Sequence, residues 1–305
     1  MFKSLIRSMR LRTLPLSLSG IVCGGVYAYS LGNSNLWANP QRFTLALIFL
    51  ILTTISLQIL SNLSNEMGDH LNGVDNEKRE GPNYGMTEGG LTEKQMWRAI
   101  NTFVIICALC GLLMTLFAHC PYWILLLGAA AIWAATHYTL GKKPYGYRGL
   151  GDLFVFLFFG LVSVIGSYFV IHSTLIGAPI LPAVGIGLLS VAVLNVNNIR
   201  DMASDEGIRQ TVPLRLGERR AKWYHTALVV VGLLCLTLGR MNYIHVEDGY
   251  SLWRLFAYLF TLPLYIWHLV GVWRHHGKAL DPMLPLLVMS TFLLSIIYTW
   301  GNYGI

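Results

Sequence analysis

Charged side chains are scarce in this chain of 305 residues, because Asp, Glu, Lys and Arg together make up only 12% of it. A soluble domain carries about 25% charged residues. Hydrophobic residues make up 54% of the chain and gather in runs of about 20 residues, the length that crosses a bilayer as a helix. The shortage of charge excludes an ordinary soluble domain and predicts an all-α, polytopic membrane helix bundle.

Cysteines are also few, and their positions argue against a metal or redox centre. All five lie in or beside the apolar runs, and only Cys107 and Cys110 have the C-x-x-C spacing. A structural zinc site usually combines two such ligand pairs, and this pair lies alone inside an expected membrane span. We interpret these cysteines as small buried apolar residues.

The apolar runs predict about nine membrane-spanning helices. The expected spans are residues 14–31, 43–64, 98–118, 122–140, 153–172, 177–198, 224–243, 252–273 and 283–302. The basic N-terminus leads straight into the first run, which we interpret as a retained helix and not as a signal peptide. We expect one domain, 1–305, made of two four-helix halves (1–140 and 141–273) and a ninth helix (274–305).

The net charge of +7 could indicate a nucleic-acid partner, but the distribution of the charges favours another explanation. All but three of the 22 basic residues (Arg42, Arg240 and Arg254) lie in the N-terminus or in alternate loops. Cytoplasmic loops of membrane proteins carry this excess of Lys and Arg. We therefore expect a cytoplasmic N-terminus, a C-terminus on the opposite side, the lipid bilayer as partner and no nucleic acid.

Two polar stretches, residues 62–82 and 195–205, each follow directly on an apolar run. Within them Asn65 and Asp69 are four residues apart, and so are Asn197, Asp201 and Asp205. On a helix this spacing puts side chains on one face. Two such faces turned toward each other would surround a hard divalent cation with the oxygen ligands it prefers. The candidate metal ligands are Asn65, Glu66, Asp69, Asp75, Asp201 and Asp205.

Simple solvated loop charges are the alternative explanation, and we adopt it for Glu77, Glu80, Glu88 and Glu93. The helix-spaced acids differ because an ionised carboxylate at bilayer depth costs about 2.5–3.5 kcal/mol unless it is paired or hydrated. Mg²⁺ removes that cost, and it usually combines one or two protein carboxylates with phosphate oxygens of a substrate. The pattern therefore suggests a diphosphate substrate held through Mg²⁺.

The loop 138–152 adds basic and aromatic residues beside these acids. Lys142, Lys143 and Arg148 there, and Arg200 next to Asp201, suit phosphate binding, although the two lysines could equally serve only as topology determinants. The tyrosines of this loop either belong to the interfacial aromatic belt or turn their rings toward a developing carbocation, and both interpretations stay open. These tyrosines are Tyr138, Tyr145 and Tyr147.

At these residues the chain resembles the UbiA superfamily of membrane-embedded aromatic prenyltransferases. Two motifs carry the resemblance, Asn65-Glu66-x-x-Asp69 followed by Gly73-x-Asp75, and Asp201-x-x-x-Asp205. The segments 12–16, 138–139, 146–152, 197–201 and 214–217 most resemble the branch that prenylates 1,4-dihydroxy-2-naphthoate for menaquinone synthesis. One departure is Glu66, where the family commonly has Asp.

The resemblance implies prenyl transfer from a polyprenyl diphosphate to 1,4-dihydroxy-2-naphthoate with decarboxylation, in a bacterial cytoplasmic (inner) membrane. It implies Mg²⁺ on the diphosphate. The implied catalytic residues are Asp69, Asp201, Asp205, Tyr138 and Arg200. The implied substrate-binding residues are Asn65, Asn197, Asn198, Lys142, Lys143, Tyr145, Tyr147 and Arg148.

Two alternatives remain at this point. Another aromatic acid, such as 4-hydroxybenzoate, could be the acceptor, although the loop 138–152 lacks the Lys-Arg-x-Thr pattern that we associate with those enzymes. A cation-coupled transporter is the other alternative. Transporters place their ionisable residues near the middle of the membrane at broken helices, whereas these acids follow the ends of apolar runs.

Overall fold

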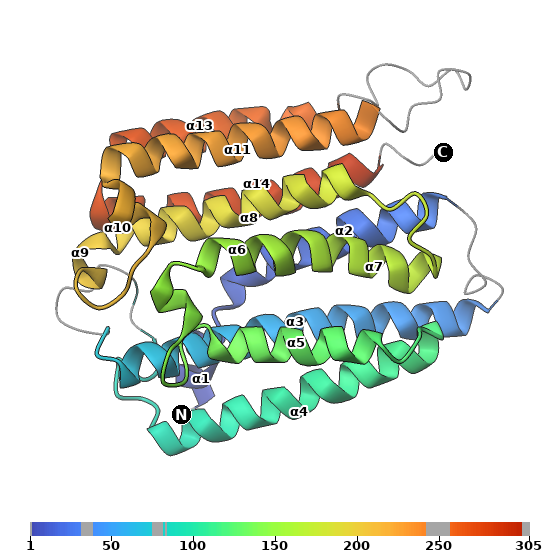
Figure 1. The fold of residues 1–305 in the computed structure, drawn as a ribbon, viewed down its shortest axis with the longest axis horizontal. Helices are drawn as coiled ribbons and strands as arrows, with labels where there is room; N and C mark the ends of the chain where they lie inside the picture. Colours follow the sequence, from blue (N-terminus) through green and yellow to red (C-terminus); the bar gives the residue numbers. More distant parts are fainter. Residues whose placement is uncertain (1, 32–38, 75–81, 83, 242–256, 301–305) are drawn as a thin grey trace.

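The structure is a computed structural model that describes residues 2–31, 39–74, 82, 84–241 and 257–300. It is an all-helical bundle whose long helices run roughly along one common axis (Figure 1). Helices suit these sequences because a chain in lipid must satisfy its backbone polar groups within the segment itself. The long elements are α2 (Leu14–Ser30), α3 (Pro40–Leu71), α4 (Glu93–Ala118), α5 (Ile124–His137), α8 (Ile180–Arg200), α11 (Glu218–Met241), α13 (Leu262–Arg274) and α14 (Met283–Trp300).

One further long helix is interrupted in its middle. It consists of α6 (Gly151–Val155), a π-helix (Phe156–Val162) and α7 (Ser163–His172), and together they form one apolar segment, Gly151–His172. A π-helix has one extra residue in each hydrogen-bonded turn, so it changes the direction in which the following side chains point. The turn also brings Gly160 against α8, where an added Cβ would lie 2.6 Å from the Cα of Gly187.

Within the described residues, each of the nine expected spans contains a helix, and six helices are long and apolar enough to cross a membrane. The three shorter ones are α2 with 17 residues, α5 with 14 and α13 with 13. The prediction of a helical, integral membrane protein is confirmed. The exact number of crossings and the division into two halves stay predictions.

Two helices extend farther than the hydrophobic runs alone indicated. Helix α3 continues past residue 64 to Leu71, and α8 continues past residue 198 to Arg200. Both polar motifs therefore begin on the last turns of long, rigid helices. A site built on helices is held more precisely than one built on loops.

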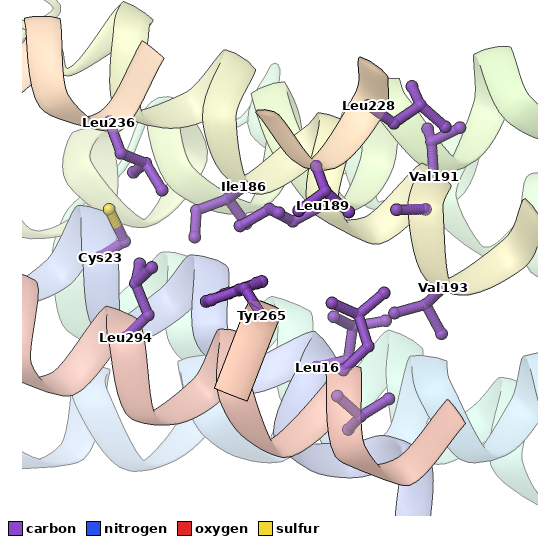
Figure 2. Packing of buried hydrophobic residues seen from close by; sticks show 14 of the residues in the cluster. Leu16, Cys23, Ile186, Leu189, Val191, Val193, Leu228, Leu236, Tyr265 and Leu294 are labelled. Carbon is purple, nitrogen blue, oxygen red and sulfur yellow. The ribbon is translucent and has the colours of Figure 1, made fainter. Parts of the chain in front are cut away.

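The largest buried cluster lies among α2, α8, α11 and α14 (Figure 2). Leu16 and Cys23 of α2 face Ile186 and Leu189 of α8 in this cluster. Because lipid is as apolar as these side chains, close packing and not the hydrophobic effect holds such helices together. Accordingly α2 and α7 approach so closely that a Cβ on Gly24 would lie 1.9 Å from a backbone oxygen of α7.

The short elements collect at one end of the bundle. These elements are α1 (Phe2–Ser8), α9 (Met202–Asp205) and α10 (Val212–Leu216), and the last turns of α3 and α8 lie beside them (Figure 1). Helix α14 ends at the opposite end of the bundle. The polar motifs, far apart in the sequence, are thereby brought to one end.

Candidate active site

A cavity of about 360 Å³ opens between the polar motifs and continues into the bundle. Its outer part is polar, with Asn65, Asp69, Asn197, Asp201 and Asp205 in the wall. Its inner wall is mainly apolar. Along α3 the lining extends from Asp69 to Leu50, about 28 Å at the rise of an α-helix. The cavity thus combines a polar head with a long apolar chamber.

The first motif is positioned by the end of α3. Asp69 Oδ1 accepts a 2.8 Å hydrogen bond from the hydroxyl of Tyr147, which belongs to the short 3₁₀ helix Tyr145–Arg148. One turn earlier, Asn65 Oδ1 accepts a 3.4 Å hydrogen bond from Thr139. Burial, and next the negative charge of Asp69, raise the pKa of the Tyr147 phenol, so this hydroxyl stays a donor at neutral pH. The loop 138–152 therefore does contact the first motif, as its position in the sequence suggested.

The second motif does not lie on one continuous helix. Helix α8 ends at Arg200, Asp201 leaves the helical region with φ −90° and ψ 7°, and Asp205 ends the separate helix α9. The spacing is nevertheless kept, because Asp201 N donates to Asn197 O at 3.1 Å and Asp205 N donates to Asp201 O at 2.9 Å. The four-residue spacing read from the sequence is therefore present as one-turn hydrogen bonds, although the helix itself is interrupted at Asp201.

Arg200 is buried, with 4% of its surface exposed, and its guanidinium is engaged by protein groups. It donates to Asp201 Oδ1 at 2.8 Å and Oδ2 at 2.7 Å, to Asn197 Oδ1 at 2.8 Å and to Asp281 Oδ1 at 2.7 Å. Such a two-pronged contact fixes the plane of a carboxylate. Arg200 thus orients Asp201 and Asn197, which differs from the direct phosphate contact expected from the sequence.

Arg209 was missed by the sequence analysis, and it stands between the two motifs. Its Nε lies 2.7 Å from Asp205 Oδ1, its Nη2 lies 3.5 Å from Asp69 Oδ1, and its guanidinium carbon is 5.3 Å from the centre of the Tyr147 ring. The four-residue spacing from Asp205 to Arg209 was the available signal. The guanidinium supplies a positive charge where the carboxylates would otherwise repel each other.

Both side-chain oxygens of Asp205 are buried and lack a hydrogen-bond partner among the described residues, although Oδ1 is held in an ion pair by Nε of Arg209 at 2.7 Å. Burial, and then the charges of Asp201 and Asp69, raise the pKa of Asp205 to about 7 against the opposing effect of Arg209. Buried carboxylate oxygens with coordination capacity to spare, in a cavity that other carboxylates and amides also line, fit a hard cation.

The carboxylates are, however, not closed into a cage. In the part of the chain that the structure describes, no three His, Cys, Asp or Glu side chains come close enough to hold a metal by themselves. Asp69, on the last turn of α3, and Asp201, directly after α8, line the same cavity. This arrangement suits an ion that completes its coordination with substrate oxygens.

Glu66 points away from the other candidate ligands. Its side chain is fully buried, with 0% of its surface exposed, and it does not belong to the cavity wall in the described structure. Its Oε1 accepts a 2.7 Å hydrogen bond from the backbone N–H of Met86. This placement argues against Glu66 as a metal ligand, because the residue after Asn65 turns to another face of α3. Asp75 lies outside the described residues.

Two of the three tyrosines of loop 138–152 lie against the cavity. Tyr138 and Tyr145 line it with their rings edge to face at 5.4 Å, and Tyr145 stacks on Phe154 at 4.0 Å. The Tyr145 hydroxyl donates to Ala134 O at 2.7 Å, which leaves the ring as its cavity-facing part. Asn198 also lines the cavity.

Three basic residues of this loop lie elsewhere. Lys142, Lys143 and Arg148 are exposed, and none of them belongs to the cavity wall in the described structure. Their side chains are therefore not brought to the carboxylates in this conformation.

The apolar chamber is widened by glycines on three helices. A Cβ added to Gly128 of α5 or Gly166 of α7 would meet no atom within 4 Å, and one added to Gly111 of α4 would meet a methyl carbon only at 4.0 Å. All three residues line the cavity. Space beside these glycines is therefore part of the chamber itself.

Comparison with known proteins gives a consistent result. The model of the UbiA prenyltransferase family matches residues 17–284. A 1,4-dihydroxy-2-naphthoate octaprenyltransferase of Escherichia coli is 40% identical over 304 residues, which cover 98% of this chain and 94% of that protein. A protein of the same name from Mycobacterium tuberculosis is 33% identical over 239 residues, 78% of each chain.

Solved structures show the same fold at low sequence identity. A UbiA homologue from Archaeoglobus fulgidus bound to GPP and Mg²⁺ aligns with a TM-score of 0.65 and 16% identity, covering 98% of both chains. The apo structure of a homologue from Aeropyrum pernix aligns with a TM-score of 0.67 and 16% identity, over 96% of this chain and 97% of that one.

Proposed function

Since this chain belongs to the UbiA prenyltransferase family, we propose that the cavity binds a polyprenyl diphosphate with its head at the polar motifs and its tail in the apolar chamber. The enzyme transfers the prenyl group to 1,4-dihydroxy-2-naphthoate, as the names of its relatives indicate, and the product is a demethylmenaquinol. One observation carries the proposal. The oxygen-rich motifs and the chamber about 28 Å long form a single cavity.

In the reaction, the C–O bond between the allylic carbon and the diphosphate breaks, and a C–C bond forms to the acceptor ring. The acceptor's carboxylate leaves as carbon dioxide, so no oxidant is required. Preorganised charges are worth most where charge develops, at the leaving diphosphate. Ring faces such as those of Tyr138 and Tyr145 would stabilise the positive charge on the allylic carbon.

Mg²⁺ fits the residues present, because Asp69, Asp201, Asp205, Asn65 and Asn197 offer oxygen ligands around one cavity. Bound Mg²⁺ would supply Lewis-acid neutralisation of the diphosphate. The side chains of Arg200 and Tyr147 hold these ligands in orientation before the substrate arrives. Such preorganisation is what a leaving group of high charge requires.

We further propose nine membrane crossings in a bacterial inner membrane, with the N-terminus and the polar end of the cavity cytoplasmic. The support is the charge pattern, because all but two of the 15 acidic residues (Glu247 and Asp248) lie on the same side as nearly all the basic ones. The prenyl tail would then lie among the helices at bilayer depth.

Turnover by the purified full-length protein tests the proposal directly. Farnesyl or geranylgeranyl diphosphate is supplied with 1,4-dihydroxy-2-naphthoate or with 4-hydroxybenzoate, in Mg²⁺ or in EDTA. We expect a prenylated naphthoquinol only with the naphthoate and only with the metal. Prenylated 4-hydroxybenzoate in its place would overturn the assignment of the acceptor, and no product with either acid would overturn prenyl transfer itself.

A further inference from the structure

A second, smaller polar region lines the cavity on the side of the N-terminal segment. Arg10 lies there between α1 and the 3₁₀ helix Leu11–Thr13, with a left-handed backbone (φ 48°, ψ 52°). A residue other than glycine in this conformation stores strain, and such residues cluster at functional sites. The strained turn is held because both the N–H and the hydroxyl of Thr13 donate to Arg10 O at 2.9 Å.

The guanidinium of Arg10 has donors that remain unused. Its Nε and Nη2 are buried and have no hydrogen-bond partner among the described residues. The group lies 4.0 Å above the centre of the Tyr84 ring, whose hydroxyl accepts a 2.9 Å hydrogen bond from Arg12. Arg10 lines the cavity and no described carboxylate forms an ion pair with it, so it gives this part of the wall a positive charge that would attract an anion.

Gln58 of α3 places an unused acceptor in the same wall, and the network around it fixes its orientation. A backbone carbonyl can only accept, so the 2.9 Å contact between Asn62 and Met9 O identifies the nitrogen Nδ2 of Asn62. Asn62 Oδ1 must then face Gln58, which donates to it through Nε2 at 3.3 Å and to Thr13 Oγ1 at 3.1 Å. Gln58 Oε1 is left buried without a donor.

We propose that Arg10 and Gln58 form the subsite that binds the aromatic acid acceptor. Arg10 donates to its carboxylate, and Gln58 Oε1 accepts from the neighbouring ring hydroxyl. This inference rests on the proposed function and adds two residues to it. The two side chains lie in one cavity wall, and Thr13 links the backbone carbonyl of Arg10 to the side chain of Gln58, so an acid with an adjacent hydroxyl group can satisfy both.

The Arg10 donors could also bind a phosphate group, but the free acceptor oxygen of Gln58 argues against a phosphate ligand. An ionised diphosphate has only acceptors, and it would face Gln58 Oε1 with like partial charge. A hydroxy acid offers one anion and one donor, which matches the pair. Moreover, Gln58 lies about three helical turns before Asp69 on α3, so this subsite lies on the side of the carboxylate motifs that faces the apolar chamber.

Kinetics of the full-length protein with each substrate varied in turn distinguishes these ligands. In Arg10→Gln we expect the KM for 1,4-dihydroxy-2-naphthoate to rise about 10- to 100-fold, the effect of losing a charge-assisted hydrogen bond. The KM for the prenyl diphosphate should stay within about twofold of its original value, since the diphosphate lies elsewhere. Arg10→Lys keeps the charge and should recover part of the loss. Lys3→Gln, on the exposed face of the preceding helix α1, is the matched control and should change neither constant.

Binding without turnover gives the second readout. We would measure the affinity of the protein, without prenyl donor, for 1,4-dihydroxy-2-naphthoate and for 1,4-dihydroxynaphthalene, which lacks the carboxylate. The original protein should prefer the acid, and Arg10→Gln should bind both alike. Gln58→Glu should weaken binding of the acid, because it adds a negative charge beside the ligand's own.

These measurements separate the acceptor subsite from the other possible roles of Arg10. A rise in the KM of the prenyl diphosphate with that of the acceptor unchanged would assign Arg10 to phosphate and overturn the proposal. An undiminished preference for the acid in Arg10→Gln would overturn it too. Failure of the original protein to prenylate the naphthoate at all is a different result, which refutes the proposed function and not this subsite alone.

Discussion

Filling the apolar chamber at Gly128 should shorten the prenyl chain that the enzyme accepts. A side chain at this position would enter open space, because an added Cβ meets no atom within 4 Å. Gly128 lies ten positions before Tyr138, which is about 15 Å toward the interior at the rise of an α-helix. The lining of α3 extends over about 28 Å, so Gly128→Phe should block roughly the inner half of the chamber.

The expected magnitude follows from overpacking, which costs about 1–3 kcal/mol when extra atoms are forced into a filled space. If a long prenyl tail must compete with the new ring, kcat/KM for that donor should fall by about 5- to 150-fold. A donor short enough to end before Gly128 does not meet the ring. Its kcat/KM should stay within about twofold of the original value.

The assay is product formation from geranyl, farnesyl, geranylgeranyl and longer polyprenyl diphosphates under the same conditions. Gly128→Ala is the first control, since it improves helix propensity without filling the chamber. Leu126→Phe is the second, because Leu126 lies on the same helix with 74% of its surface exposed away from the chamber. An equal loss for short and long donors in Gly128→Phe would refute the reasoning, and so would an equal selectivity in Leu126→Phe.

Three further predictions test the polar end of the cavity. Asp69→Asn and Asp201→Asn should each reduce turnover at least about 10- to 100-fold, because each removes a charged metal ligand. Both variants should still insert into the membrane and elute as folded protein. Near-normal turnover in either variant would exclude that aspartate from the metal site. Glu66→Gln should leave the Mg²⁺ dependence of turnover unchanged and mainly lower the Tm, because Glu66 bonds the backbone of Met86; a higher Mg²⁺ requirement would restore it as a ligand. Lys143→Ala should leave the KM for the prenyl diphosphate unchanged, since the lysine is exposed outside the cavity wall, and a several-fold rise would show that the loop closes over the substrate.

The membrane fold was predictable because it depends on properties that each segment carries alone. A long apolar run must satisfy its backbone as a helix wherever it lies in the bilayer. The two polar motifs were likewise visible as local patterns. Within each motif the first two residues, Asn65 and Asp69 or Asn197 and Asp201, do lie one helical turn apart. Even there the break at Asp201 was missed, because no proline or glycine marks the end of α8 at that point.

Contacts between side chains of separate helices and loops were much less predictable. Asn65 and Glu66 are neighbours in the sequence, yet Asn65 lines the cavity while Glu66 bonds to the loop at Met86. Successive residues of a helix point about 100° apart, so a difference of one position decides whether a carboxylate reaches the site. The sequence motif includes both residues, and only the packing of α3 separates them.

By itself, the sequence determined an all-helical membrane protein of the UbiA type, with its acidic motifs at one end of the bundle. Apolar runs, charge asymmetry and motif spacing are local, and they act before any helix packs. The tertiary structure decided that Arg200 orients Asp201, that Arg209 bridges the two motifs, and that the lysines of the loop lie outside the cavity. These outcomes depend on distances of a few ångströms between side chains from separate helices and loops, because hydrogen bonds and ion pairs form only at such short range.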